Sequence, residues 1–234
     1  MLKKLLWGFL LISAPLYSTY VQAGSDTIIV AVDNAYPPYM YGDRKNAKGL
    51  YPKQIKAIFN RMSVKVDVQA LPWKRALSNG EKGNSAVGGI YKNSTRLEIY
   101  DFSQPIFEET LVIYVAKDNP FPFKKISDLK GKKVGLNLGW SYGDEIDKAR
   151  KKRLFATQEA TSNLLNMKKL VHGRVDCIII DQLAASKIIL HEKFSDKVEK
   201  LEHPASINKA YVVFAKSTHN LELIKKFDKA LFDM

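Results

Sequence analysis

Short apolar strands alternate with amphipathic helices along this chain, and this alternation limits the possible folds more than any other feature. In the first half, the pattern predicts strands at 27–32, 64–70 and 86–90, with helices at 54–62 and 73–79 between them. A strand, a helix and a second strand in this order usually connect parallel neighbours of one sheet. The first half therefore predicts a mostly parallel sheet with covering helices.

The second half repeats this organisation. Strands are expected at 133–137 and 175–180, and helices at 142–153, 160–171 and 183–190. The two similar α/β units indicate two lobes rather than a single sheet.

Strands at 111–116 and 210–215 are expected to join these two units, and an amphipathic helix is expected at 220–232. The chain has 234 residues, 46% of them hydrophobic and 26% charged. This composition is that of a globular protein and excludes extended disorder, a collagen-like fibre and a coiled coil.

The N-terminus has the three parts of a secretory signal peptide. Met1–Lys4 is positively charged, 5–17 is apolar, and Val21-Gln22-Ala23 offers a small-residue cleavage site after Ala23. An uncleaved anchor is the alternative, but the apolar run is short and mixed compared with the ~20 apolar residues of a membrane span. We therefore expect residues 24–234 to be exported as a soluble protein.

The single cysteine, Cys177, excludes an intrachain disulfide framework and a cysteine-rich zinc site. It lies in an apolar strand, where a thiol is usually inert. The four histidines are not spaced as metal ligands, so we expect no metal and no cofactor.

Five motifs follow one another in a recognisable order. They are Asp33-x-x-Tyr36-Pro37-Pro38-Tyr39, Pro72-Trp73-Lys74-Arg75-Ala76-Leu77, Thr95-Arg96 with Asp101-Phe102-Ser103-x-Pro105, Asp128-Leu129-Lys130-Gly131-Lys132-Lys133-Val134-Gly135, and Gly173-Arg174-Val175-Asp176 leading to Asp181. In this order the chain resembles the periplasmic solute-binding proteins of ABC transporters, in the amino-acid-binding family 3. The resemblance covers essentially all of residues 24–234.

The resemblance implies a two-lobed α/β protein with the type II periplasmic binding fold, which closes on its ligand like a clam shell. Residues 24–109 would form the first part of lobe 1 and residues 110–210 would form lobe 2. Residues 211–234 would return to lobe 1 as a strand and the final helix. The protein would be a monomer in the periplasm that captures a small polar solute, an amino acid or a related carboxylate, for an ABC permease of the inner membrane.

The resemblance also assigns the two charged groups of the binding site. Arg96 matches the arginine that clamps the carboxylate of the ligand, and a bidentate guanidinium suits this task. Asp181 matches the acid that binds the ammonium group, although an aspartate at this place also suits a helix N-cap. Asp33 matches a position that meets a cationic side chain in some relatives, and a turn-capping role is equally open.

The remaining candidates surround these charges. Trp73 and Tyr36 match the aromatic residues that enclose the apolar part of the ligand. Ser141 lies in Gly139-Trp140-Ser141, a turn expected to place N–H groups at a helix N-terminus, where anions bind. The other candidate ligand-binding residues are Arg75, Gly89 and Tyr91.

Several residues depart from the family pattern and leave the ligand open. Asn93 stands where the family usually has threonine, and Gly88–Tyr91 where small hydroxyl residues are common. With Lys74, Arg75, Lys92 and Arg96 all expected near the mouth of the site, an organic acid without an ammonium group also fits. A periplasmic enzyme of the dehydratase kind and a ligand-sensing module are the alternative functions.

The excess of Lys and Arg over Asp and Glu adds one argument about what the protein binds. The formal charge is +13, and it falls by two to +11 when Lys3 and Lys4 leave with the leader. The run 151–153 is interpreted as a solvated helix end, because no aromatic face for nucleic acid accompanies it. Export argues against a nucleic-acid partner, so the excess charge favours a carboxylate-bearing solute steered toward Arg75 and Arg96.

Overall fold

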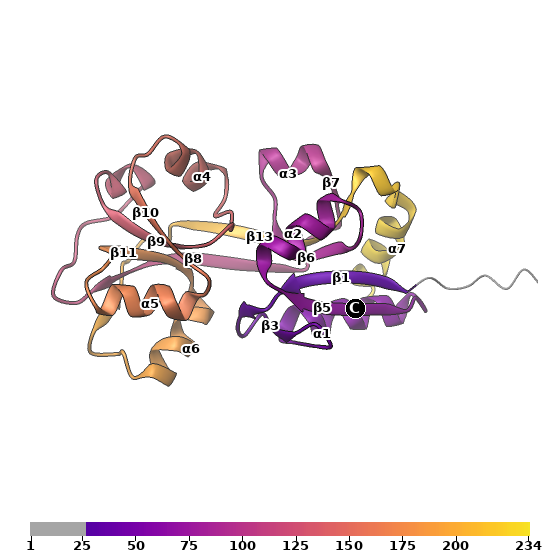
Figure 1. The fold of residues 1–234 in the computed structure, drawn as a ribbon, viewed down its shortest axis with the longest axis horizontal. Coiled ribbons are helices and arrows are strands. Elements are labelled where there is room, and N and C mark those ends of the chain that lie inside the picture. Colours follow the sequence, from indigo (N-terminus) through magenta and orange to yellow (C-terminus); the bar gives the residue numbers. More distant parts are fainter. Residues whose placement is uncertain (1–26) are drawn as a thin grey trace, which may run out of the picture.

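Two long antiparallel strands, β8 (Phe107–Ala116) and β13 (Ser206–Ala215), join the two halves of the computed structural model, which describes residues 27–234. Their pairing runs from Leu111 opposite Ser206 to Phe107 opposite Ala210. Figure 1 shows both strands passing from one lobe to the other. The predicted signal peptide lies outside the described residues.

Lobe 1 is built around the parallel strands β5, β1 and β6, with β1 in the middle. Its main strands are β1 (Ile28–Asp33), β5 (Val66–Leu71), β6 (Ala86–Tyr91) and β7 (Tyr100–Phe102). Its helices are α1 (Leu50–Arg61), α2 (Trp73–Glu81), α3 (Ser94–Ile99) and α7 (Leu221–Phe232), with the 3₁₀ turn η2 (Lys216–Thr218) before α7. A small separate sheet contains β2 (Ala35–Tyr36), β3 (Met40–Asp43) and β4 (Asn46–Lys48).

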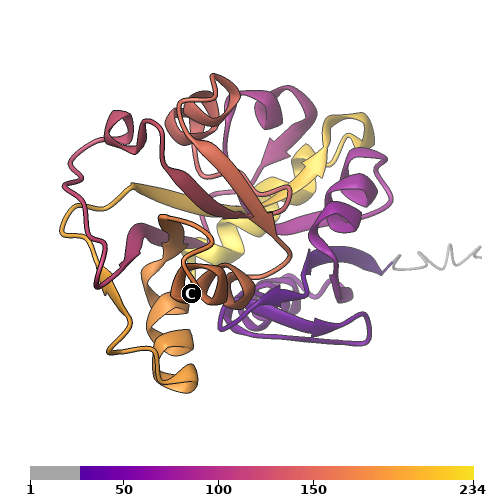
Figure 2. The same cartoon turned by 60° about the vertical axis from the view of Figure 1, so that its left-hand side comes forward.

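Lobe 2 has the same plan, with β9 between two parallel partners, β10 and β11. Its strands are β9 (Lys133–Asn137), β10 (Ala156–Ala160), β11 (Cys177–Asp181) and β12 (Val198–Lys200). Its helices are α4 (Asp144–Lys151), α5 (Asn163–Val171) and α6 (Gln182–Glu192), with the 3₁₀ turn η1 (Ile126–Leu129). Figure 2 shows this lobe from a second side.

The main sheet continues through both lobes in the order β10-β9-β11-β8-β13-β6-β1-β5. The predicted two-lobed α/β fold is therefore confirmed. The parallel strands of each lobe follow the prediction, whereas β8 and β13 make the whole sheet mixed. The lobe boundaries expected from the sequence stay a prediction.

Apolar periodicity explains most of these elements. In α1, Ile55, Ile58 and Phe59 form one buried face, and the Phe59 ring lies 5.4 Å from that of Phe227 in α7. The C-terminal helix thus packs against α1 in lobe 1 (Figure 1). None of the helices within residues 27–234 has the length and apolar character that a membrane span requires.

Three predicted helices differ from the structure. The helix expected at 54–62 starts four residues earlier, at Leu50, and ends at Arg61. The helix expected at 142–153 covers only 144–151, because Gly143 at its N-cap has a φ of 97°. The helix expected at 160–171 starts at Asn163, and the residues before it form β10. This edge strand is mostly exposed and polar, so its sequence lacks the apolar alternation that predicts a strand.

Gly89 in β6 is required by both its backbone angle and its surroundings. Its φ is 76°, and a Cβ atom there would lie 2.4 Å from the Tyr51 ring and 2.9 Å from the Met40 sulfur. Gly131 also has a φ of 76° but has no atom within 4 Å of such a Cβ.

We therefore expect Gly89→Ala to lower the free energy of unfolding by about 2–4 kcal/mol, since strain and overpacking add. Gly131→Ala is the matched control and should cost only about 1 kcal/mol, since it carries the backbone strain alone. Urea unfolding of both variants measures the difference. Equal losses would show that Tyr51 and Met40 move aside without cost.

Candidate functional site

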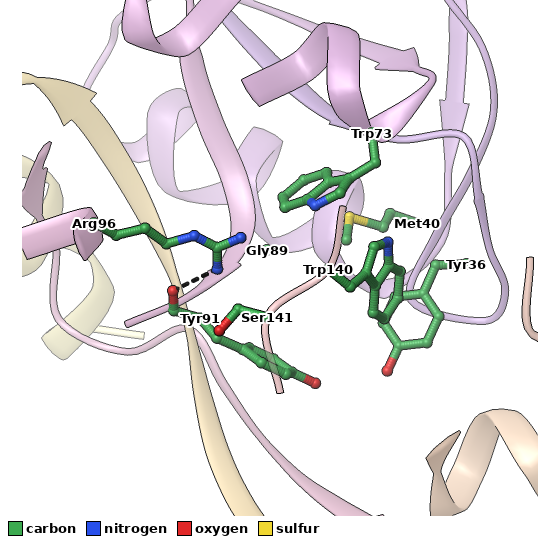
Figure 3. Close-up of a pocket in the computed structure, with 8 residues that line it drawn as sticks. All are labelled: Tyr36, Met40, Trp73, Gly89, Tyr91, Arg96, Trp140 and Ser141. Atoms are coloured by element: carbon green, nitrogen blue, oxygen red, sulfur yellow. Dashed lines mark hydrogen bonds between the residues drawn. The ribbon is translucent and has the colours of Figure 1, made fainter. Parts of the chain in front are cut away.

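A small pocket lies between the lobes, and Figure 3 shows the side chains around it. We call it the central pocket. It is lined by Tyr36, Met40, Trp73, Gly89, Tyr91, Arg96, Trp140 and Ser141. Lobe 1 supplies the first six, and the loop after β9 supplies Trp140 and Ser141. The free volume is about 10 Å³, about the room that one water molecule needs. The lobes are thus closed on each other in this structure.

Arg96 is held by the short helix α3. Asn93 caps this helix, because its side-chain oxygen accepts a hydrogen bond of 2.8 Å from the Arg96 backbone N–H. The guanidinium donates to the backbone carbonyl of Tyr91 at 2.8 Å, which Figure 3 marks with a dashed line. Only 9% of Arg96 is exposed, and this burial lowers its pKa to about 10.

No salt bridge to Arg96 is found within residues 27–234. The nearby carboxylate of Asp147 lies 3.5 Å from Arg150 instead and accepts a hydrogen bond from Ser141. A guanidinium has five N–H donors, and Tyr91 accepts from one of them. The buried charge of Arg96 therefore has donors to spare for an anion in the central pocket.

The tryptophans Trp73 and Trp140 close the pocket from opposite lobes. The Trp73 indole N–H donates to the Gly139 carbonyl at 3.2 Å, and the Trp140 indole N–H donates to Asp33 at 2.9 Å. The Trp140 ring packs edge-on against Tyr36, with 4.5 Å between ring centroids. The Trp140 indole thus fills part of the space between the lobes.

Ser141 also connects the lobes. Its hydroxyl accepts a hydrogen bond of 2.9 Å from the Asn93 side chain and donates to Asp147. The expectation that this turn lies at a helix N-terminus is wrong, because α4 starts only at Asp144, after the positive φ of Gly143.

Glu109 in β8 lies behind two tyrosines of the central pocket. The hydroxyls of Tyr36 and Tyr91 both donate to its Oε2 atom, the latter at 2.5 Å. Figure 3 shows these hydroxyls pointing to the same side of the pocket. Glu109 is 1% exposed, and this burial raises its pKa well above the usual value.

Asp181 and Asp33 are the other buried acids near the pocket. Asp181 caps α6 by accepting from the Ala184 N–H at 2.8 Å, and burial raises its pKa. With Tyr39 it lines a neighbouring, more open cavity of about 470 Å³. Burial also raises the pKa of Asp33, to about 6.

The structure brings most of the predicted site residues together. Six of them line the central pocket: Tyr36, Trp73, Gly89, Tyr91, Arg96 and Ser141. Asp33 joins it through Trp140, and Asp181 lies beside it, next to Tyr39. Arg75 is not brought to the pocket, because its side chain is exposed on the surface of α2.

Three residues of the site were not predicted from the sequence. Met40 and the ring of Trp140 line the central pocket, and Glu109 accepts hydrogen bonds from two of its tyrosines. A signal existed for Glu109, an acid at the start of a strand that is otherwise apolar from residue 111 onward. Met40 lies in a short strand of a separate sheet, which no periodicity indicates.

Within residues 27–234, no three His, Cys, Asp or Glu side chains are grouped as metal ligands. Cys177 is buried, and this raises its pKa to about 12. A thiol with so high a pKa is a poor nucleophile at neutral pH.

The two-lobed fold, with a buried arginine and aromatic rings in the cleft, defines a protein that encloses a small solute. Residues 28–234 match the model of the bacterial extracellular solute-binding proteins, family 3. The chain belongs to this family.

Curated relatives of the chain bind amino acids. It is 25% identical over 211 residues to the L-cystine-binding protein TcyJ of Escherichia coli (strain K12), covering 89% of this chain and 77% of the relative. It is 22% identical over 218 residues to the arginine-binding extracellular protein ArtP of Bacillus subtilis (strain 168), covering 91% and 82%.

Solved structures show the same fold. An ancestral arginine-binding protein bound to arginine superposes with a TM-score of 0.75 and 27% identity, covering 89% of this chain and 92% of that one. A histidine kinase sensor domain similar to periplasmic binding proteins has a TM-score of 0.77 and 21% identity, covering 88% and 89%. The latter likeness concerns the fold alone.

The raised pKa of Asp33 predicts that stability depends on pH. In the unfolded chain this pKa returns from about 6 to its usual 3.8. The folded state then binds more protons between these values, so its stability falls as the pH rises through this window. The two-unit shift corresponds to at most ~3 kcal/mol.

We expect Asp33→Asn to flatten the decline of the melting temperature of the solute-free protein between pH 4 and pH 6. Asp118→Asn, at an exposed acid, is the control and should leave the slope unchanged. Thermal unfolding in a pH series measures the effect. Identical slopes for wild type and Asp33→Asn would contradict the prediction.

Proposed function

We propose that this protein is an exported receptor that captures an amino acid between its lobes and delivers it to an ABC permease. The observation that carries the proposal is the buried guanidinium of Arg96, which lines the central pocket and has no salt bridge to a carboxylate of residues 27–234. Burying such a charge is costly unless an anion pairs with it. The α-carboxylate of an amino acid supplies this anion and can accept two parallel hydrogen bonds.

Asp181 is the proposed partner of the α-ammonium group. It lies at the carboxyl end of β11, in the crevice where α/β sheets bind ligands. Its Oδ1 atom accepts the N-capping bond from the Ala184 N–H, and the proposal assigns the second oxygen, beside Tyr39, to the solute. The N-cap role and the proposed ligand-binding role are thus compatible.

The sequence of the N-terminus and the family support the proposed location and partner. A signal peptide cleaved after Ala23 would release residues 24–234 into the periplasm, where a monomer would meet its permease. The family and the curated relatives TcyJ and ArtP are solute-binding proteins, which favours binding without chemistry over a periplasmic enzyme.

Replacing Arg96 tests the carboxylate assignment. Arg96→Ala should weaken amino-acid binding by ~2–5 kcal/mol, because the carboxylate of the ligand would be buried unpaired. Isothermal titration calorimetry with the amino acid that most raises the melting temperature of the wild type measures the loss.

Arg75→Ala is the matched control, since it removes an exposed arginine of α2, also in lobe 1. It should bind as the wild type does. Unchanged affinity in Arg96→Ala, or a substrate chemically converted by the wild type, would contradict the proposal.

Asp181→Asn separates amino acids from plain carboxylic acids. Asparagine is as good an N-cap as aspartate, so the variant should keep α6 and its melting temperature. Its affinity for an amino acid should fall at least about tenfold, since it loses a charged partner of the ammonium group. The same affinity for the amino acid in variant and wild type would remove Asp181 from the site.

A further inference from the structure

Two short segments of lobe 2 hold most of the net positive charge of the chain. Residues 117–133 and 148–153 contain eleven lysines and arginines and two aspartates, a net charge of +9 against +13 for the whole chain. Solubility requires a net charge but does not require its concentration in one place. The local excess therefore calls for an explanation of its own.

The fold brings the two segments together on one surface. The backbone N–H of Gly131 donates to the Leu154 carbonyl at 3.0 Å, and the backbone N–H of Ala156 donates to the Lys132 carbonyl at 2.8 Å. The residues around η1 therefore lie beside the end of α4. Six exposed cations of these segments form a surface that we call the basic face: Lys124, Lys125, Lys130, Lys133, Lys152 and Arg153.

The acids next to the basic face bind backbone groups instead of its side chains. Asp128 accepts from the backbone N–H groups of Lys124 and Lys125 at 2.8 and 3.0 Å. Asp176 accepts from the backbone N–H of Lys133 at 2.7 Å. None of the six cations forms a salt bridge with an acid of residues 27–234. The basic face thus keeps an excess of positive charge for a partner outside the chain.

The basic face and the central pocket lie at opposite ends of lobe 2. Lys133 is the first residue of β9, and Arg153 stands three residues before the start of β10, the parallel neighbour of β9. Trp140, which lines the central pocket, follows the other end of β9. A partner on the basic face therefore leaves the central pocket uncovered.

We propose that the basic face attaches this protein reversibly to a bilayer that contains anionic phospholipids. Five of its six cations are lysines, whose compact, hydrated ammonium groups suit a diffuse anionic surface better than the bidentate binding of a single phosphate. Each such cation near an anionic bilayer multiplies the binding constant about fivefold. The attachment would keep the receptor in the layer next to its permease. The proposal goes beyond the proposed function and takes only the exported location from it.

Vesicle sedimentation tests the proposal with the chain from residue 24 onward, because an apolar leader binds lipid by itself. At about 20 mM salt the protein should bind vesicles of phosphatidylcholine with about a third phosphatidylglycerol, and should not bind vesicles of phosphatidylcholine alone. At about 500 mM salt the binding should be lost, because salt screens the charges of both surfaces.

Replacing all six cations of the basic face by glutamine should weaken binding to the anionic vesicles at least about 100-fold. The matched control removes the same charge from lobe 1 and should bind within about threefold of the wild type. Its substitutions, all at exposed residues, are Lys45→Gln, Lys48→Gln, Lys53→Gln, Lys56→Gln, Arg61→Gln and Lys65→Gln. If the basic-face variant does not fold, the triple variant Lys124→Gln, Lys125→Gln, Lys130→Gln replaces it and should lose at least about tenfold.

Three results overturn the proposal. They are no preference of the wild type for anionic over neutral vesicles, equal losses in the basic-face variant and the lobe 1 control, and binding of a DNA duplex through the basic face where vesicles do not bind. Failure to bind vesicles leaves the amino-acid receptor as proposed, since the basic-face variant should bind its solute with wild-type affinity. Failure to bind any amino acid likewise leaves the vesicle result unchanged.

Discussion

The antiparallel pairing of β8 with β13 is the constraint on which the rest of the structure depends. These strands carry the chain out of lobe 1 and back, so the sheets of both lobes are attached to one ladder. The ladder sets α3, which holds Arg96, opposite the loop that holds Trp140 and Ser141. It also carries Glu109 at the junction itself, where a side chain adjoins both lobes.

Charge is distributed unevenly around the junction. Within residues 27–234, neither Arg96 nor Glu109 forms a salt bridge, although Tyr91 accepts from Arg96 through its backbone carbonyl and donates to Glu109 through its hydroxyl. Burial lowers the pKa of Arg96 and raises that of Glu109. Burying each of these groups costs stability that a bound solute can offset.

Much of this architecture was predictable because burial leaves a periodic trace in sequence. The apolar runs of β1, β6 and β11 and the buried face of α1 indicate their elements directly, and ordered motifs point to Arg96 and Trp73. The edge strand β10 and the small sheet of β2, β3 and β4, which contains Met40, have no such apolar periodicity. Arg75 is the opposite case, a residue that the sequence placed in the site and the structure does not. It lies two residues after Trp73, but on a helix these two positions face different directions, and Arg75 faces the solvent. Glu109 was missed because its role arises from tyrosines distant in sequence.

Trp140 links the two lobes at the pocket, because its indole N–H donates to Asp33 and its ring packs against Tyr36. The surroundings of this indole are thus set by residues of both lobes. Tryptophan emission depends on the polarity and contacts around the ring, so the fluorescence of Trp140 should change whenever the two lobes move relative to each other. The chain therefore carries an intrinsic optical probe at the contact between its lobes.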